Sequence, residues 1–126
     1  VAGGKNVLLV LNDRIPDGRD VSWIWDVDFE DYVEDFSKIT ISGDRCNDMA
    51  LRIKYSVQSS KFKVQSYLAE RDLASQDNSK VKIYEELNKA IKESIHLTDK
   101  KETLYILPTY SAMLEVRKIL TGKKIL

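Results

Sequence analysis

Nine acidic residues crowd the stretch from Asp13 to Asp35, where only Arg14 and Arg19 oppose them. Two arginines against nine acids leave this stretch with a local charge of −7, in a chain whose formal net charge is zero. Carboxylates at such density can bind Mg²⁺, orient a histidine, or simply remain solvated. Solvation explains any single one of them, whereas the group as a whole also fits a binding role.

Both tryptophans of the chain, Trp23 and Trp25, lie within this acidic stretch. A solvated loop has no need of two tryptophans, and a core segment does not accommodate so many carboxylates. The combination predicts a shaped, partly buried acidic edge where something binds. In a strand the two rings would face the same way, and they would form either a core anchor or an interface hot spot.

The other residues capable of chemistry offer less. Gly3-Gly4-Lys5 is too short for a phosphate-binding loop, and it precedes an apolar run instead of following one. The single histidine, His96, is expected near a helix C-terminus as a partner of the helix dipole, and the single cysteine, Cys46, is expected in the core. With only these two residues, no Ser/His/Asp or Cys/His catalytic arrangement is credible, and a classical zinc site made from this chain alone is excluded. Arg45 could meet a phosphate or form a structural ion pair.

The bulk composition predicts one globular domain. The chain has 126 residues, of which 43% are hydrophobic and 32% charged, and this length can bury a sizeable core. Balanced charge gives no general attraction to nucleic acid or anionic membranes, and no apolar run is long enough for a membrane span. A lone cysteine fits a reducing, cytoplasmic location. Because the sequence begins with Val1 and not with an initiator methionine, we expect it to be an excised piece of a longer protein.

The hydrophobic pattern predicts strands that alternate with helices. Strands are expected at residues 6–11, 38–42, 62–69 and 103–107, with a loop at 70–78. Helices are expected at residues 28–36, from an Asp44 cap to about 57, at 79–96, and from a Thr109 or Ser111 cap to a stop at Gly122. Residues 22–27 fit either a short strand or the start of a helix. This alternation predicts an α/β layered fold with a mostly parallel sheet.

In open α/β sheets, ligands bind beyond the carboxyl ends of the strands. The predicted carboxyl ends fall at residues 12–13, 42–45, 69–71 and 108–110. The acidic stretch leaves from the first of these ends. Its carboxylates are therefore predicted to lie at the functional edge of the sheet.

Three stretches resemble, in order, the C-terminal domain of the MurT family, the Mur-ligase-like subunits of lipid II isoglutaminyl synthase. The first covers residues 11–30 and contains the specific string Asp-Val-Ser-Trp-Ile-Trp-Asp, with Pro16 standing where the family is expected to have Ala. The others cover residues 42–55 and 108–115. The resemblance implies a Rossmann-like domain with helices on both faces, whose central ATP-binding domain lies outside this chain.

The resemblance also implies a reaction. The complete enzyme uses ATP and Mg²⁺ to activate the α-carboxylate of D-glutamate in the lipid II stem peptide at the inner face of the membrane. Ammonia comes from a glutaminase partner of the GatD kind, and the isolated domain is expected to be inactive. Asn12, Asp13 and Arg14 would lie toward the nucleotide.

The resemblance also implies that an aspartate of this domain completes the Cys-His pair of the glutaminase. Asp26 is the first choice for this catalytic role and Asp20 the second. Trp23, Trp25 and Asp28 are expected at the partner interface. The alternative from a different class is a free-standing receiver-like module that binds Mg²⁺ through strand-end carboxylates.

Overall fold

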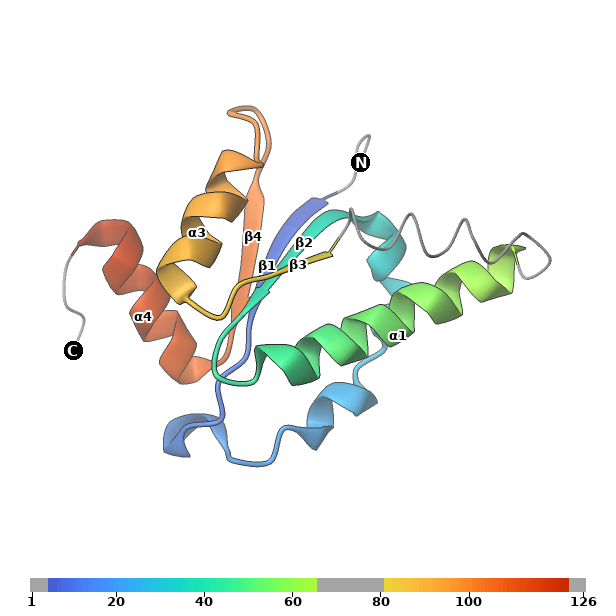
Figure 1. Cartoon of the computed structure of the whole chain (residues 1–126), viewed down its shortest axis with the longest axis horizontal. Helices are drawn as coiled ribbons and strands as arrows, with labels where there is room; N and C mark the ends of the chain where they lie inside the picture. The colour runs from blue at the N-terminus through green and yellow to red at the C-terminus, as the bar shows by residue number, and fades with distance from the viewer. Residues whose placement is uncertain (1–4, 66–80, 123–126) are drawn as a thin grey trace.

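A four-stranded sheet lies at the centre of the structure, a computed structural model that describes residues 5–65 and 81–122 (Figure 1). Its strands are β1 (Lys5–Val10), β2 (Phe36–Ser42), β3 (Val81–Ile83) and β4 (Leu104–Pro108). They are ordered β3-β2-β1-β4, and every pairing is parallel. The predicted α/β class with a parallel sheet is confirmed.

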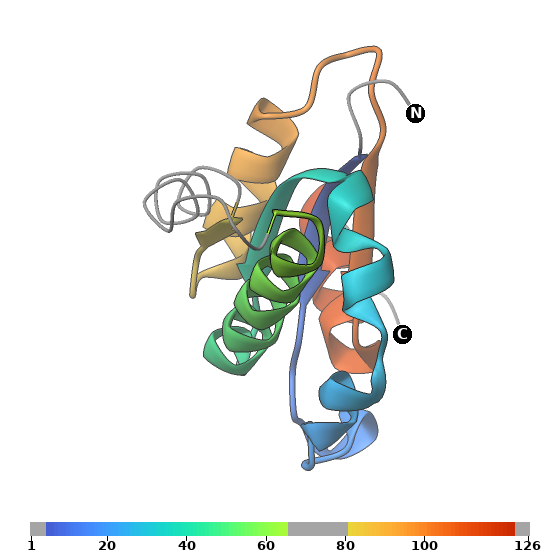
Figure 2. The ribbon, with the colours of Figure 1, turned by 90° about the vertical axis from the view of Figure 1, so that its right-hand side faces the viewer.

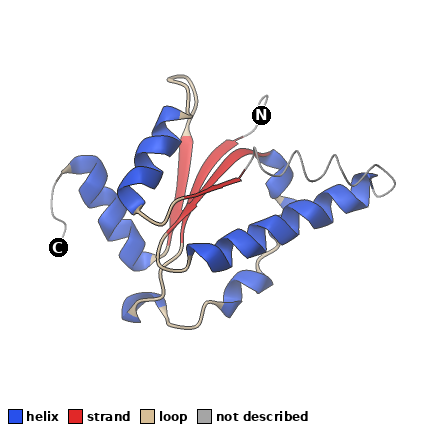
Figure 3. Cartoon of the chain, in the orientation of Figure 1, coloured by secondary structure: helices blue, strands red, loops and turns tan. Residues whose placement is uncertain are grey.

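Helices cover both faces of the sheet, as predicted. Figure 1 shows α1 (Cys46–Gln65) on one side of the sheet, and α3 (Leu87–His96) and α4 (Tyr110–Thr121) on the other. Figure 3 shows the same layers, with the strands in red between helices in blue. Successive residues of β1 point to opposite faces, so Leu9 packs into the core under α1 and Leu8 into the core under α3 and α4. This double burial explains the continuous apolar run in β1.

The core under α1 is built from one apolar face of that helix, which includes Cys46 as predicted. Cys46, Met49, Ile53 and Val57 are all buried against β1 and β2. Burial also raises the pKa of the Cys46 thiol, so this cysteine is a core residue rather than a nucleophile. In the described part of the chain, no helix is long and apolar enough to cross a membrane.

The connection from β1 to β2 consists of four short 3-10 turns. They are η1 (Ile15–Asp17), η2 (Ser22–Asp26), η3 (Phe29–Asp31) and η4 (Val33–Asp35). The predicted helix at 28–36 is therefore wrong, and residues 22–26 adopt neither a strand nor an α-helix. Figure 2 shows this blue-to-cyan segment beside α1, which is seen nearly end-on. Ile24 and Val33 are buried in the α1 core, and this tertiary packing overrides the local helical spacing.

The third strand was predicted at the wrong place in the chain. Residues 62–65 belong to α1, which continues past its predicted end, so the strand predicted at 62–69 is wrong over those four residues. The rest of that strand and the predicted loop at 70–78 lie outside the described residues. The third strand is β3, inside the predicted helix 79–96, because Val81 and Ile83 pair with Ile39 and Ile41 of β2. The local sequence does not show that β2 lies beside these residues. The helix α3 therefore begins later than predicted, at Leu87.

The last strand and helix match their predicted bounds within one residue. Pro108 is the final residue of β4, which lies at the edge of the sheet, where a strand tolerates a residue without an N–H. Thr109 occupies the N-cap position of α4, and Gly122 ends the helix in the left-handed conformation. His96 ends α3 as predicted.

Candidate functional site

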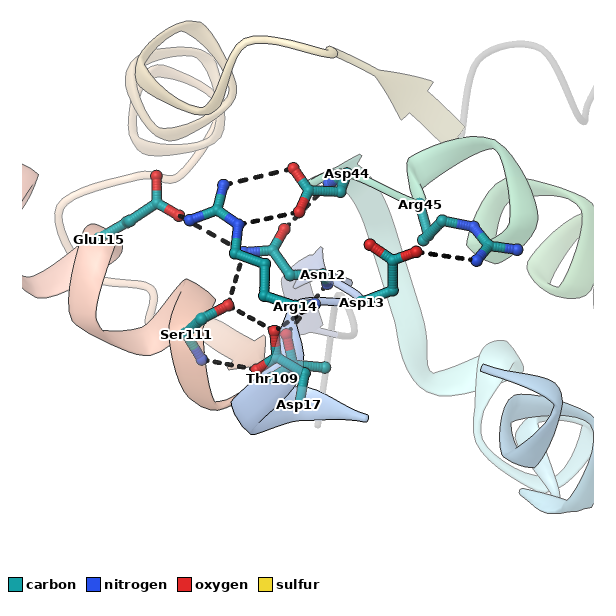
Figure 4. Close-up of polar contacts among 9 residues, drawn as sticks. All are labelled: Asn12, Asp13, Arg14, Asp17, Asp44, Arg45, Thr109, Ser111 and Glu115. Carbon is teal, nitrogen blue, oxygen red and sulfur yellow. Dashed lines mark hydrogen bonds and ion pairs between the residues drawn. The ribbon is translucent and has the colours of Figure 1, made fainter. Parts of the chain in front are cut away.

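Asn12 lies where the strand order reverses between β1 and β4, the point at which open parallel sheets form a binding crevice. Only 3% of its surface is exposed. Its backbone N–H donates to Oγ1 of Thr109 at 3.0 Å, and Nδ2 donates to Oγ of Ser111 at 3.0 Å. Its Oδ1 accepts the backbone N–H of Asp44 at 2.9 Å. Asn12 therefore joins the ends of three strands (Figure 4).

Arg14 crosses the same edge of the sheet. Its Nε lies 3.0 Å from Oδ2 of Asp44, which follows β2, and its Nη1 lies 2.6 Å from Oε1 of Glu115 on α4. The hydrogen bond with Asp44 is the main reason that the pKa of Arg14 is raised. The arginine side chain is still 47% exposed. It can exchange an exposed carboxylate for another anion.

Asp17 fastens η1 to the start of α4. Its Oδ1 accepts the backbone N–H of Ser111 at 2.7 Å, and its Oδ2 accepts the Ser111 hydroxyl at 2.5 Å. Partial burial works against ionisation, but the hydrogen bonds from Ser111 outweigh it, so the pKa of Asp17 is lowered. Asp17 thereby supplies the side-chain cap that Thr109, the residue at the N-cap position, does not.

Asp13 points to the other side of this edge, toward α1 (Figure 4). Nη1 of Arg45 lies 3.1 Å from its Oδ2, and Nε of Arg45 lies 2.6 Å from Oδ2 of Asp48. The structural ion pair that the sequence left open for Arg45 is therefore present. Asp44 was predicted to cap α1, but the helix begins at Cys46 and the Asp44 carboxylate pairs with Arg14 instead.

The structure brings the three predicted nucleotide-facing residues together at one edge. Asp13 and Arg14 are partly accessible there, and Asn12 fixes the loop that carries them. Among the described residues, no group of three or more acidic, histidine or cysteine side chains could hold a metal ion. The edge offers a carboxylate and a guanidinium, groups suited to a hydroxyl and to a phosphate.

Gly43 lets the turn after β2 pass directly over the end of β1. Its φ is +106°, and a Cβ built on it would meet the backbone oxygen of Leu11 at 2.4 Å. The same turn is fixed by the bond from the Arg45 backbone N–H to that oxygen, at 2.9 Å. Only glycine fits this close approach.

The two tryptophans of η2 have different surroundings. Trp23, 43% exposed, lines an apolar groove of about 510 Å³ beside Leu107 and Tyr110 at the β4 edge. Trp25, 47% exposed, packs edge-on against Tyr55 of α1 with ring centroids 5.8 Å apart. The same-side arrangement expected for a strand is absent because a 3-10 turn rotates residues two apart to different sides.

The two candidate catalytic aspartates differ in their environment. Asp20 accepts the backbone N–H of Ser22 at 2.9 Å, and this bond is the main cause of its lowered pKa. It lines a polar hollow of about 260 Å³ together with Trp25 and Arg45. Asp26 is exposed at the end of η2, and its carboxylate accepts no hydrogen bond from the described part of the chain. Asp28 is likewise exposed.

Arg52 contacts the candidate site, although no role was predicted for it from the sequence. It lies on α1 with 3% of its surface exposed, and its guanidinium donates to the backbone oxygens of Ile24 and Val27. It also forms an ion pair with Glu30. The sequence offers one signal for this role. Arg52 directly precedes the apolar residue Ile53, and the chain has an excess of acids at residues 13–35 that could pair with it.

Comparisons with known proteins agree on one family. A family model described as MurT ligase C-terminal matches residues 2–113. The MurT subunit of lipid II isoglutaminyl synthase (glutamine-hydrolyzing) from Streptococcus pneumoniae is 35% identical over 119 residues, which cover 93% of this chain and 22% of that protein. The same subunit from Staphylococcus aureus strain COL is 42% identical over 53 residues, covering 41% of this chain and 12% of that protein. The matched part of the chain thus spans about a fifth of the length of the Streptococcus pneumoniae protein and a smaller share of the Staphylococcus aureus protein.

Proposed function

Because the chain belongs to the MurT ligase C-terminal family, we propose that it forms the C-terminal domain of the ligase subunit of a glutamine-hydrolysing lipid II isoglutaminyl synthase. The observation that carries the proposal is the family match over residues 2–113. The reaction would be ATP-dependent amidation of the D-glutamate α-carboxylate in the peptidoglycan precursor. A glutaminase subunit would supply the ammonia.

The strand-end edge would face the nucleotide when the domains of the whole protein close. Asp13 and Arg14 are the accessible polar groups there, and Asn12 holds their loop against α4. ATP supplies the phosphoryl group that activates the substrate carboxylate. This chain would add a guanidinium for phosphate charge and a carboxylate for a hydroxyl. Any Mg²⁺ would need ligands beyond those of the described residues.

Asp26 would complete the catalytic group of the glutaminase. A carboxylate beside an imidazole fixes its tautomer and stabilises the imidazolium that forms during catalysis. Asp26 suits this role because it is exposed and accepts no hydrogen bond among the described residues, whereas Asp20 already caps Ser22. Trp23 and Trp25 on the same turn are both half-exposed. With Asp28 they would form the surface that the glutaminase covers.

The proposal is tested with Asp26→Asn in the full-length protein, assembled with its glutaminase. Glutamine-dependent amidation should fall on the order of 10³-fold or more, because the asparagine cannot stabilise an imidazolium. Amidation driven by added ammonium chloride should continue, and the complex should stay assembled. Asp20→Asn tests the second choice, and Asp31→Asn, an exposed acid on the neighbouring turn, is the control. Full glutamine-dependent activity of Asp26→Asn would remove Asp26 from the mechanism.

A further inference from the structure

We propose that Arg52 is a positioning residue that fixes Asp26 for glutamine-dependent catalysis, an inference that rests on the proposed function. Its Nε donates to the carbonyl oxygen of Ile24 at 2.9 Å, and its Nη2 donates to that of Val27 at 2.5 Å. These two carbonyls belong to the residue two positions before Asp26 and the residue directly after it. One guanidinium therefore holds the backbone on both sides of the aspartate.

Arginine suits this task because its donors form a rigid planar fork. The two bonds tie the carbonyls of Ile24 and Val27 to α1, and the Val27 carbonyl also accepts the backbone N–H of Phe29 at 2.9 Å. Two donors on one planar group also fix the orientation of the two peptide units relative to each other. A lysine could satisfy one carbonyl but could not set this orientation.

Glu30 balances the buried charge of Arg52. Its Oε2 lies 2.9 Å from Nη1 and its Oε1 lies 2.9 Å from Nη2, a two-point ion pair. The guanidinium therefore binds both carbonyls and a carboxylate while almost fully buried. A buried charge that is paired and fully hydrogen-bonded holds a single geometry.

Two aromatic rings complete the enclosure of Arg52. The guanidinium carbon lies 5.2 Å from the ring centroid of Trp25 and 5.1 Å from that of Phe29. Trp25 immediately precedes Asp26, so its ring and backbone are held by the same side chain of α1. The Asp26 carboxylate itself remains exposed. Arg52 thus fixes the backbone that carries the Asp26 carboxylate without binding the carboxylate itself.

The test uses the full-length protein assembled with its glutaminase, with Arg52→Lys and Arg52→Met. The kcat of glutamine-dependent amidation should fall on the order of 10- to 100-fold, because a misplacement of about 1 Å costs that much. The KM for glutamine and the rate with ammonium chloride should stay unchanged. Arg52→Lys should retain more activity than Arg52→Met. Lys54→Met removes an exposed charge from the same helix and should leave both rates unchanged.

Each outcome decides the proposal. Equal loss of the ammonium-driven rate would show that Arg52 only stabilises the fold, and the proposal would be overturned. Glu30→Gln is the milder variant, since Arg52 keeps both carbonyl bonds, and it should retain most of the glutamine-dependent rate. If Asp26→Asn is inactive with glutamine while both Arg52 variants are fully active, the positioning role is overturned and the proposed function stands. If Asp26→Asn is itself fully active, both fall.

Discussion

Asp17 closes the loop after β1 through three hydrogen bonds, two from Ser111 and one from the backbone N–H of Arg14. These bonds favour the ionised carboxylate, so the pKa in the folded protein lies below the ordinary value of 3.8. A lowered folded pKa contributes stability that is complete above the unfolded pKa and is lost as pH falls through the folded one. Asp17 therefore ties loop and helix at neutral pH and releases them in acid.

Asp17→Asn should lower the free energy of unfolding by about 1 kcal/mol at pH 7, because asparagine keeps one acceptor oxygen but loses the second one and the charge that strengthens these hydrogen bonds. Below pH 4 the difference between the two proteins should shrink, because the wild-type carboxylate then becomes protonated. Urea unfolding at several pH values measures both effects. Asp31→Asn, at an exposed position, serves as the control. A difference that persists unchanged to pH 2 would contradict the assignment.

Arg14→Ala tests the nucleotide-facing edge in the full-length complex. Losing a charge-assisted bond to phosphate should raise the KM for ATP about tenfold. The fold should be little affected, because exposed ion pairs like those of Arg14 with Asp44 and Glu115 contribute at most about 1 kcal/mol. Arg19→Ala, an exposed arginine on the same connection, is the matched control. Equal KM values for the two variants would place the nucleotide elsewhere.

At the scale of elements, the turn between β2 and α1 depends on a single glycine. Gly43 has a φ of +106°, and the backbone of Leu11 leaves no room for a Cβ. Gly122, at the end of α4, also has a positive φ of +71°, but a Cβ added there would have nothing within 4 Å. Substituting Gly122 therefore measures the destabilisation from the backbone conformation alone, and substituting Gly43 adds the destabilisation from the steric clash.

Gly43→Ala should destabilise the chain by about 2 to 4 kcal/mol, because a strained φ and an overpacked contact add together. Gly122→Ala should cost only about 1 kcal/mol, the conformational part alone. Thermal and urea unfolding of the two variants measure the difference. Similar losses in both would mean that the Leu11 backbone moves aside at little cost.

The two wrongly predicted helical segments, at the start of 79–96 and at 28–36, have the same cause. Ile83 fits the apolar stripe of the helix predicted at 79–96, yet Val81 and Ile83 form β3 because Ile39 and Ile41 offer a sheet edge. Residues 28–36 likewise show helical spacing, yet Val33 is anchored in the α1 core and the segment divides into short turns. Local pattern records which residues are apolar but not which distant partner buries them.

At the scale of the molecule, the parallel sheet gathers one functional edge from distant parts of the sequence. Residues that follow β1, β2 and β4 meet there through Asn12, Asp44 and Thr109. The described part of the chain nevertheless holds no group of side chains that could bind a metal ion, and Asp13 is paired with Arg45. Under the proposed function, this edge would face a nucleotide held by another part of the whole protein.

Isothermal titration of the isolated chain with MgCl₂ separates this view from a receiver-like module. We expect no saturable binding at millimolar concentrations, because a hard divalent cation needs several oxygen ligands at once. Asp13→Asn, as a control, should leave the titration unchanged. Saturable binding that disappears in Asp13→Asn would favour the receiver-like alternative.

Residue order alone was enough to predict the parallel α/β class, the family, and the position of the acidic stretch at a strand exit. Those conclusions needed only an apolar run covered on both faces, alternating elements, and a long specific string around Trp23 and Trp25. The family was confirmed by the match over residues 2–113, and the parallel sheet by the strand pairings.

How the acidic stretch is held became visible only in three dimensions. Contacts of Asn12 and Asp17 with Ser111 join residues more than 90 positions apart, and Arg52 reaches Ile24 across 28 positions. Their bonds depend on the order of the strands and on which helix face meets the connection after β1. Hydrogen bonds between distant residues arise from chain topology, which sequence spacing does not encode.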